Sequence, residues 1–312
     1  MDVSIVIATR NTCALTCAAV GSVIGSRDAL TKEVIVVDNA STDDTASVMA
    51  REFPAVKYLR CERNLGFAGA NNAGAKVTRG DLLLLLNSDA RLKADSLGRA
   101  VAWMRAHEDC GVAGAQLLNP DGSRQNSIAN FPSLVTELLN KSLLRRLLPK
   151  RFPGKEQVFN GAVEVESVVG AFFLTRREAW KAVGGFDERY FFFFEETDYC
   201  LQAQRHGWKV FHLPDIEVWH EQGKTAKQWA AAARIEYWRS RYAFFRKYYH
   251  VPSRLVLMAG LWVRLSADFL SSFLATLFTL GRSAGWKQKF AIHRALVSWH
   301  CKGCPEEMGL PR

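Results

Sequence analysis

Two acidic residues in the first half of the sequence directly follow apolar, strand-like segments. Asp38 comes after Glu33–Val37, and Asp89 lies three residues beyond the five leucines Leu82–Leu86. Ligands of open α/β sheets bind beyond the carboxyl ends of the strands. A carboxylate there can accept hydrogen bonds from a nucleoside, or bind a divalent cation together with phosphate oxygens. Taken singly, each acid also fits an ordinary turn residue; together they favour a nucleotide site.

A glycine- and asparagine-rich segment, Gly66–Ala75, lies between these two acids. We interpret it as a loop that opens a helix. Small residues let a backbone approach a diphosphate, and Arg63, Asn64, Gly66 and Asn71 suit such an approach. The segment contains neither GxGxxG nor a Walker A lysine, which argues against a dinucleotide oxidoreductase and a P-loop kinase.

A second acidic group, Glu195-Glu196-Thr197-Asp198, directly follows the four phenylalanines Phe191–Phe194. Acids are favoured in the first turn of a helix by its dipole, and this structural reading suits Asp198 better than Glu196. The functional alternative is a general base in a partly apolar wall, where burial would raise the pKa of the carboxyl. The sequence therefore predicts a base among these acids.

His220 ends a further strand-like segment, EVWH. A lone histidine is often structural, but here it could join Asp89 in binding a cation at the diphosphate. The pair Cys301 and Cys304 also suggests zinc, although a single CxxC supplies too few ligands for a four-coordinate site.

The elements that must position these residues begin with a βαβ unit. Val3–Ala8 and Glu33–Val37 are β-branched runs, and Cys13–Ile24 between them has a helical pattern. Strands this apolar are typical of a parallel sheet covered on both faces. Ser41 and Asp44 fit a capping box for the next helix. The fold class predicted is α/β.

The chain has 312 residues, of which 48% are apolar and 23% charged, as in globular proteins. Residues 1–220 hold 26 Lys+Arg and 26 Asp+Glu, whereas residues 221–312 hold 15 and 5, so the net charge of +10 belongs to the last third. The seven cysteines are scattered, which fits a reducing compartment. The N-terminal residues show no signal-peptide pattern.

The basic last third is also apolar. Thr225–Tyr249 has a long helical pattern, and Leu255–Leu280 is apolar apart from Arg264 and Asp268. Three alternatives remain open: helices lying in a membrane interface, a membrane span, or a soluble helical subdomain that could form a homodimer contact. Nucleic acid is a competing anionic partner, but the sequence contains no recognised nucleic-acid motif, which makes it unlikely.

These segments, in this order, resemble glycosyltransferase family 2, in particular its rhamnosyltransferase-like members that build bacterial surface polysaccharides. Each motif is weak, but the ordered set is specific and covers roughly residues 1–225. The matching segments are Val3–Asn11, Val34–Thr45, Arg63–Gly74, Leu82–Ala90, Val169–Trp208 and Glu217–Thr225.

The resemblance implies a GT-A fold, a nucleoside-diphosphate sugar donor such as a dTDP- or UDP-sugar, and Mg²⁺ or Mn²⁺. It implies an inverting transfer, with rhamnose as a candidate sugar, to a lipid-linked or polysaccharide acceptor. We expect a cytoplasmic enzyme at the inner face of the cell membrane. The implied site comprises Thr9, Arg10, Asp38, Arg63, Asn64, Gly66, Asn71, Asn87 and Ser88 for the nucleotide, Asp89 and His220 for the metal, and Glu196, Glu195 and Asp198 for catalysis.

Two departures from the family pattern leave other functions open. Asn87 stands where the family's D-x-D motif has its first acid, and Glu195-Glu196 stands where the family has Glu-Asp. An inactive nucleotide-sugar or glycan-binding protein is therefore an alternative. A nucleotidyltransferase is another, although Ala8–Cys13 offers only Arg10 as a cation.

The predicted organisation is a GT-A domain followed by a membrane-associating helical region. The GT-A domain covers residues 1–225, with a nucleotide half (1–118) and an acceptor half (119–225), and the helical region covers residues 226–312. The whole interpretation requires Asp89 and Glu196 to face one shared crevice.

Overall fold

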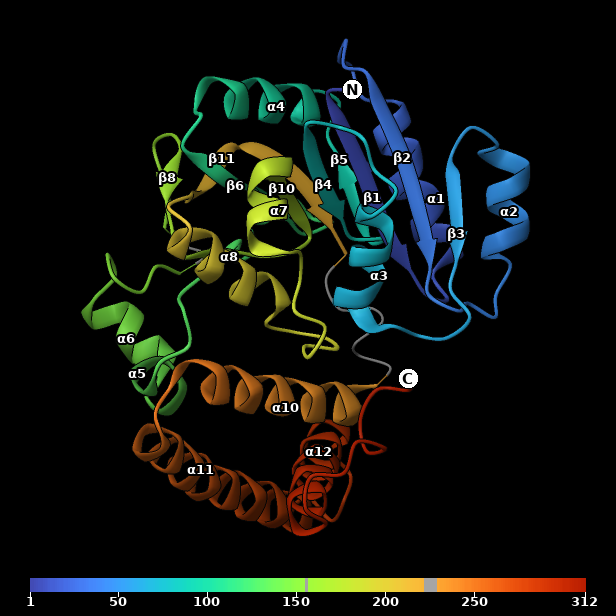
Figure 1. The fold of residues 1–312 in the computed structure, drawn as a ribbon. Coiled ribbons are helices and arrows are strands. Elements are labelled where there is room, and N and C mark those ends of the chain that lie inside the picture. The colour runs from blue at the N-terminus through green and yellow to red at the C-terminus, as the bar shows by residue number, and fades with distance from the viewer. Residues whose placement is uncertain (155–156, 222–228) are drawn as a thin grey trace.

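The computed structural model describes residues 1–154, 157–221 and 229–312. An α/β body holds the first two thirds of the chain, and a layer of three long helices lies beneath it (Figure 1). The N-terminus lies at the body, while the C-terminal segment returns from the helical layer toward it. The body contains the strand ends at which the sequence predicts a site.

The described residues form a nine-stranded sheet in the order β3-β2-β1-β4-β10-β6-β11-β5, with β8 paired to β11. β1 to β4 are mutually parallel, and β6 is parallel to β11, but β10 runs antiparallel between β4 and β6. The strands are β1 (Val3–Thr9), β2 (Lys32–Asp38), β3 (Lys57–Arg60), β4 (Leu82–Leu86), β5 (Ala90–Leu92), β6 (Cys110–Leu118), β8 (Val163–Glu164), β10 (Phe172–Arg176) and β11 (Lys209–His220), with β7 (Ile128–Ala129) and β9 (Ser167–Val168) forming a separate pair.

Apolar residues of the central strands alternate between two cores. Leu82, Leu84 and Leu86 face the core that includes α1 and α4, whereas Leu83 and Leu85 face the core that includes α3 and α8. The five-leucine run is therefore buried on both faces, as predicted. The helices of the body are α1 (Cys13–Ile24), α2 (Thr45–Glu52), α3 (Gly66–Ala75), α4 (Ser96–Ala106), α5 (Leu134–Leu138), α6 (Lys141–Leu147), α7 (Arg177–Val183) and α8 (Glu195–Arg205).

Two local predictions were wrong. Gly66–Ala75 is helical throughout rather than a loop that opens a helix, because its small side chains pack tightly against β1 and β2. The capping box at Ser41 does not form, since α2 begins only at Thr45. The Ser41 hydroxyl instead accepts a hydrogen bond from the backbone of Asn11, which joins the loops after β1 and β2.

The last third forms α10 (Ala230–Tyr248), α11 (Val251–Phe278) and α12 (Ala284–Cys301). Aromatic and leucine side chains from all three helices make one core. The expected domain boundary at residue 225 lies outside the described residues, as does the start of the helix expected from Thr225. α11 is long and apolar enough to cross a membrane, judged by length and composition alone.

Candidate active site

The sheet topology brings the predicted strand ends to one edge. Thr9 at the end of β1 is in register with Asp38 at the end of β2, and Asp38 with Arg60 at the end of β3. β4, β6 and β11 run in the same direction as β1, so Asn87-Ser88-Asp89 and His220 follow strands that end at this edge. β10 starts there because it is antiparallel to β4.

Asp38 is buried, and each of its two carboxylate oxygens accepts a hydrogen bond from the protein. Oδ1 accepts a hydrogen bond from the backbone of Ser41 at 2.8 Å, and Oδ2 accepts one from the Tyr58 hydroxyl at 2.5 Å. The Arg60 guanidinium lies 3.5 Å from Oδ2. Burial and Asp38 both raise the pKa of Tyr58, which keeps this hydroxyl a donor. Arg63, to which the sequence assigns phosphate binding, is exposed on the loop beyond β3.

The loop before α3 is held by hydrogen bonds from Asn39 and by close contact with Phe191. The Asn39 side chain donates to Asn64 Oδ1 at 2.7 Å and accepts from the backbone of Leu65 at 2.7 Å. Gly66 has a φ of +74°, and a Cβ there would lie 2.3 Å from the carbonyl oxygen of Phe191. Only glycine fits this approach. The loop before α3 therefore contacts residues Phe191–Phe194, which lead directly to Glu195.

Hydroxyl groups connect β1 to the Asn87-Ser88-Asp89 loop. Thr9 Oγ1 lies 2.6 Å from Thr16 Oγ1 and 2.9 Å from Thr12 Oγ1, and Thr12 donates to Ser88 Oγ at 3.2 Å. Thr12 and Thr16 carry no sequence signal of their own, yet they join Thr9 and Ser88. Asn71, by contrast, donates to the carbonyl oxygen of Phe67 within α3.

Asp89 and His220 lie together, as the sequence predicts for a cation site. His220 Nε2 is 3.3 Å from Asp89 Oδ1. His220 Nδ1 is 2.8 Å from Gln125 Oε1, while Gln125 Nε2 donates to the His220 carbonyl and to Asn119 Oδ1. These donations orient the amide so that Oε1 accepts a hydrogen bond from His220 Nδ1, and Nε2 is the ring nitrogen that faces Asp89. A metal-binding histidine is held by this kind of second hydrogen bond.

One imidazole nitrogen and one carboxylate oxygen thus lie side by side at the end of the sheet. The donor set of one imidazole nitrogen and one carboxylate therefore fits Mn²⁺ or Mg²⁺, with phosphate oxygens completing the shell. In the described part of the chain, no cluster of three or more His, Cys, Asp or Glu side chains has metal-binding geometry. The pair would thus depend on a ligand to complete a site.

Glu195 and Glu196 open α8, and each has one carboxyl oxygen that is buried without a partner. The Oε2 atoms of both side chains are buried and have no hydrogen-bond partner among the described residues. Burial raises the pKa of Glu195 well above its ordinary value, and the neighbouring Glu196 adds to the rise. Burial also raises the pKa of Glu196, although backbone N–H groups including that of Gly170 oppose it. A carboxyl whose pKa is raised by burial is a candidate general base.

The backbone before Glu195 is strained. Phe193 and Phe194 have φ values of +72° and +75°, a region that non-glycine residues avoid. Each such residue costs of order 1–3 kcal/mol, so the surrounding packing must hold it. Asn11 and Ala40, which follow β1 and β2, also have positive φ values. Strain is therefore present on both sides of the candidate site.

Asp198 has a different environment from the two glutamates. Its carboxylate accepts hydrogen bonds from Tyr190 at 3.0 Å and Tyr248 at 2.7 Å, and Lys247 lies 2.7 Å away. Lys247 also pairs with Asp187 at 2.8 Å. These contacts tie α8 to α10, so Asp198 lies in an anchoring network, and its part in catalysis stays a prediction.

Short contacts connect the two groups of acids. The Asn87 backbone N–H donates to the carbonyl of Ala171 at 3.1 Å. At the adjacent Gly170, a Cβ would lie 3.6 to 3.8 Å from the side chain of Glu196. Glu196 therefore packs on the segment that holds the loop of Asp89. The two groups of acids are therefore connected through residues 170 and 171, and the shared crevice stays a prediction.

The C-terminal segment touches two residues assigned to the nucleotide. The carbonyl oxygen of Pro311 accepts hydrogen bonds from Arg10 Nη1 at 3.0 Å and Asn64 Nδ2 at 2.5 Å. The Arg312 guanidinium lies over the ring of Phe191, 5.0 Å from its centre. A protein carbonyl thus occupies donors that the sequence assigns to phosphate oxygens.

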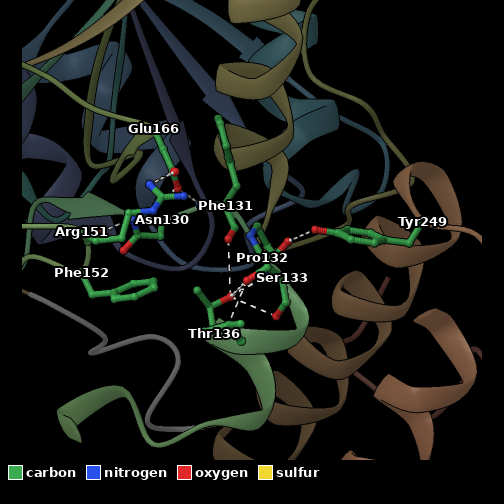
Figure 2. Close-up of a pocket in the computed structure, with 10 residues that line it drawn as sticks. Asn130, Phe131, Pro132, Ser133, Thr136, Arg151, Phe152, Glu166 and Tyr249 are labelled. Atoms are coloured by element: carbon green, nitrogen blue, oxygen red, sulfur yellow. Dashed lines mark hydrogen bonds and ion pairs between the residues drawn. The ribbon is translucent and has the colours of Figure 1, made fainter. Parts of the chain in front are cut away.

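A cavity of about 340 Å³ lies in the acceptor half, between the segment before α5 and Tyr249 at the end of α10 (Figure 2). Arg151 forms an ion pair with Glu166 in its wall. A second cavity, of about 310 Å³, shares this ion pair and reaches Gln204 of α8. No site residue predicted from the sequence lines either of these two cavities.

Comparison with known proteins decides the family. The family model described as glycosyl transferase family 2 matches residues 4–184. The chain belongs to this family. It is a glycosyltransferase, and its sheet and helices have the GT-A architecture. The family assignment from sequence motifs is thus confirmed.

Curated relatives are similar over most of the chain. The N-acetylglucosaminyl-diphospho-decaprenol L-rhamnosyltransferase of Mycobacterium tuberculosis is 28% identical over 254 residues, covering 74% of this chain and 81% of the relative. The dTDP-rhamnosyl transferase RfbF of Shigella flexneri is 25% identical, covering 72% and 70% respectively.

Solved structures share the fold. The mannosyltransferase PcManGT from Pyrobaculum calidifontis, in complex with GDP-Man and Mn²⁺, has a TM-score of 0.57 at 17% identity and covers 96% of this chain and 86% of its own. GalNAc-T7 with UDP, GalNAc and Mn²⁺ has a TM-score of 0.55 at 18% identity and covers 70% and 44%.

Proposed function

We propose that this glycosyltransferase moves a sugar, with L-rhamnose the leading candidate, from a nucleoside diphosphate to a hydroxyl of a lipid-linked or polysaccharide acceptor. The observation that carries the proposal is the packing of Glu196 on Gly170, next to the segment that holds Asn87. This packing supports a role for a carboxyl of raised pKa next to the predicted diphosphate site. The names of the two rhamnosyltransferase relatives favour dTDP-rhamnose as the donor.

Residues beyond β1, β2 and β3 would bind the donor. Asp38, held by Tyr58 and Arg60, would accept hydrogen bonds from the nucleoside. Asn64 and Arg10 would supply donors for the diphosphate once they are freed from the Pro311 carbonyl. Arg63 is exposed and can turn toward the phosphates. Asp89 and His220 would hold Mg²⁺ or Mn²⁺, which offsets the negative charge that develops on the leaving diphosphate.

Glu196 would act as the general base, with Glu195 as the alternative. The acceptor hydroxyl transfers its proton to the carboxylate as its oxygen attacks the anomeric carbon. The bond from this carbon to the diphosphate oxygen breaks, and the electron pair leaves with the nucleoside diphosphate. Attack on the face opposite the leaving group inverts the anomeric configuration. The excess cations of the last third suit an anionic membrane surface, where a lipid-linked acceptor would be found.

The test is nucleotide release from dTDP- and UDP-sugars with Mn²⁺ or Mg²⁺ and a lipid-linked acceptor. We expect turnover with one donor and a loss of at least about 100-fold in Asp89→Ala. Asp81→Ala is the matched control, because Asp81 is exposed at the opposite end of β4. Tight nucleotide binding without turnover for every donor would contradict the proposal and favour a binding protein.

A further inference from the structure

α11 is apolar on two opposite faces, and only one of them is covered. Its buried residues Leu257, Leu261, Leu265 and Ser272 form one stripe against the helical core. At 100° per residue, the opposite face is also apolar, and its side chains are 39% to 72% exposed. That face consists of Leu255, Val256, Val263, Leu270, Phe273, Leu274 and Leu277.

A second exposed apolar element lies on α6 and its flanks. Leu144 is buried, but Leu139, Leu143, Leu147 and Leu148 are 51%, 53%, 65% and 53% exposed. The sequence contains no acid between Glu137 and Glu156. The exposed cations of this segment are Lys141, Arg145, Arg146, Lys150 and Arg151. We call residues 139–151 the leucine arm.

The leucine arm is connected to α11 through α5, which lies against the helical layer (Figure 1). Leu138, at the end of α5, packs on Gly260 of α11 so closely that a Cβ there would lie 2.6 Å from it. Glu137 pairs with Arg241 of α10 at 2.8 Å, which anchors α5 to the helical layer. The leucine arm therefore starts where α5 meets α11.

Charge decides which partner suits these two faces. Arg282, Lys287 and Lys289 are exposed beyond the end of α11, and residues 221–312 hold ten more cations than acids. A second copy of the chain would bring the same cations against them. An anionic lipid surface offers both an apolar interior and negative headgroups. Arg264 and Asp268, which pair at 3.8 Å, lie away from the outward face of α11.

We propose that the leucine arm and the outward face of α11 together dock on an anionic lipid leaflet. The leucines and Phe273 enter the interface while the cations contact headgroups. α11 then lies along the membrane and keeps its packing with α10 and α12. This proposal rests on the proposed function, because docking would hold the active site near a lipid-linked acceptor.

The test is co-sedimentation of the full chain with phosphatidylcholine vesicles, with and without phosphatidylglycerol. We expect binding to the anionic vesicles, and a loss of at least about tenfold in Leu143→Ser/Leu147→Ser. Arg145→Ala/Arg146→Ala should lower the anionic-vesicle partition coefficient by about 30-fold. Matched controls on the body are the exposed Ile24→Ser and Arg51→Ala/Lys57→Ala, which should bind as the wild type does.

Several outcomes would overturn the proposal. These are equal binding by the arm variants and the wild type, no preference for phosphatidylglycerol, or a wild-type dimer that the leucine variants dissociate. Donor hydrolysis without vesicles is measured in parallel. Vesicle binding without any donor turnover would refute the proposed function alone, and turnover without vesicle binding would refute the docking surface alone.

Discussion

Buried polar side chains at the ends of β1 and β2 have hydrogen-bond partners, whereas those at the start of α8 lack some of theirs. Thr9 and Asp38 end these two strands and Asn39 follows β2, and all three are buried with hydrogen-bond partners for their side chains. At the start of α8, Glu195 and Glu196 each bury a carboxyl oxygen without a partner. A buried unpaired polar group costs about 1–3 kcal/mol, so the two regions differ in stability as well as in chemistry.

This difference suggests separate tasks for the two regions. A network of satisfied hydrogen bonds fixes positions, which suits the binding of a donor. Unpartnered carboxyls with raised pKa values retain the capacity to take up a proton, which suits a base. Substitutions should therefore affect turnover at α8 and binding or metal affinity at the sheet edge.

The largest expected effect is on turnover, in Glu196→Gln. Loss of a general base typically lowers kcat by about 10²–10⁴, while donor binding should be unchanged. Because burial raises the pKa of Glu196, wild-type activity should fall on the acidic side at a pH above 4.5. Rate and equilibrium nucleotide binding are measured across pH. Glu178→Gln, in the exposed first turn of α7, is the control. Full activity of Glu196→Gln would contradict the assignment of Glu196 as the general base and would favour Glu195 instead.

A smaller effect is expected on metal affinity, in Gln125→Met. Without Oε1, His220 loses the acceptor that fixes its tautomer, and Mn²⁺ affinity should fall by about 10–100-fold. The measurement is a Mn²⁺ titration by electron paramagnetic resonance with nucleotide present. Gln116→Met is the control. It replaces another buried glutamine, whose amide donates hydrogen bonds to Gln125 and Ser127 but not to His220. Equal losses in the two variants would contradict a specific role for Gln125.

A modest effect is expected on donor KM when residues 309–312 are removed. This frees Arg10 and Asn64 from the Pro311 carbonyl, and each hydrogen bond contributes about 0.5–1.5 kcal/mol. The KM for the donor should fall by about two- to tenfold with kcat unchanged. The measurement is the donor KM of the truncated and the full-length chain from steady-state kinetics. A rise in KM would contradict the prediction and would mean that the segment forms part of the donor pocket.

The smallest effect is on stability, in Glu195→Gln. The folded-state pKa of Glu195 is raised above its ordinary value of 4.5, so the protonated form stabilises the fold and this contribution is lost as pH rises through the folded pKa. Glutamine stays neutral. The variant should gain stability over the wild type as pH increases above 4.5, as measured by urea unfolding at several pH values. A pH-independent difference would mean that Glu195 does not titrate in this range.

Much of the fold was predictable because its signals are local. The β-branched runs predicted β1 and β2, Cys13–Ile24 was predicted with its observed bounds, and the leucine run could only be a central strand. Gly66–Ala75 was misjudged because its composition resembles a loop, while its helix depends on close packing against β1 and β2. The helical tail was expected, but its exposed and covered faces were not.

The sequence by itself determined the family, the strand ends and the residue types available there, since these follow from short motifs and from apolar runs. Only the tertiary structure decided how each group is paired. Tyr58 and Arg60 contact Asp38, and Gln125 is hydrogen-bonded to His220, 95 residues away in the sequence. Glu195 and Glu196, in contrast, each keep one carboxyl oxygen without a partner. Hydrogen-bond satisfaction depends on contacts between distant segments, and no local pattern of residues encodes these contacts.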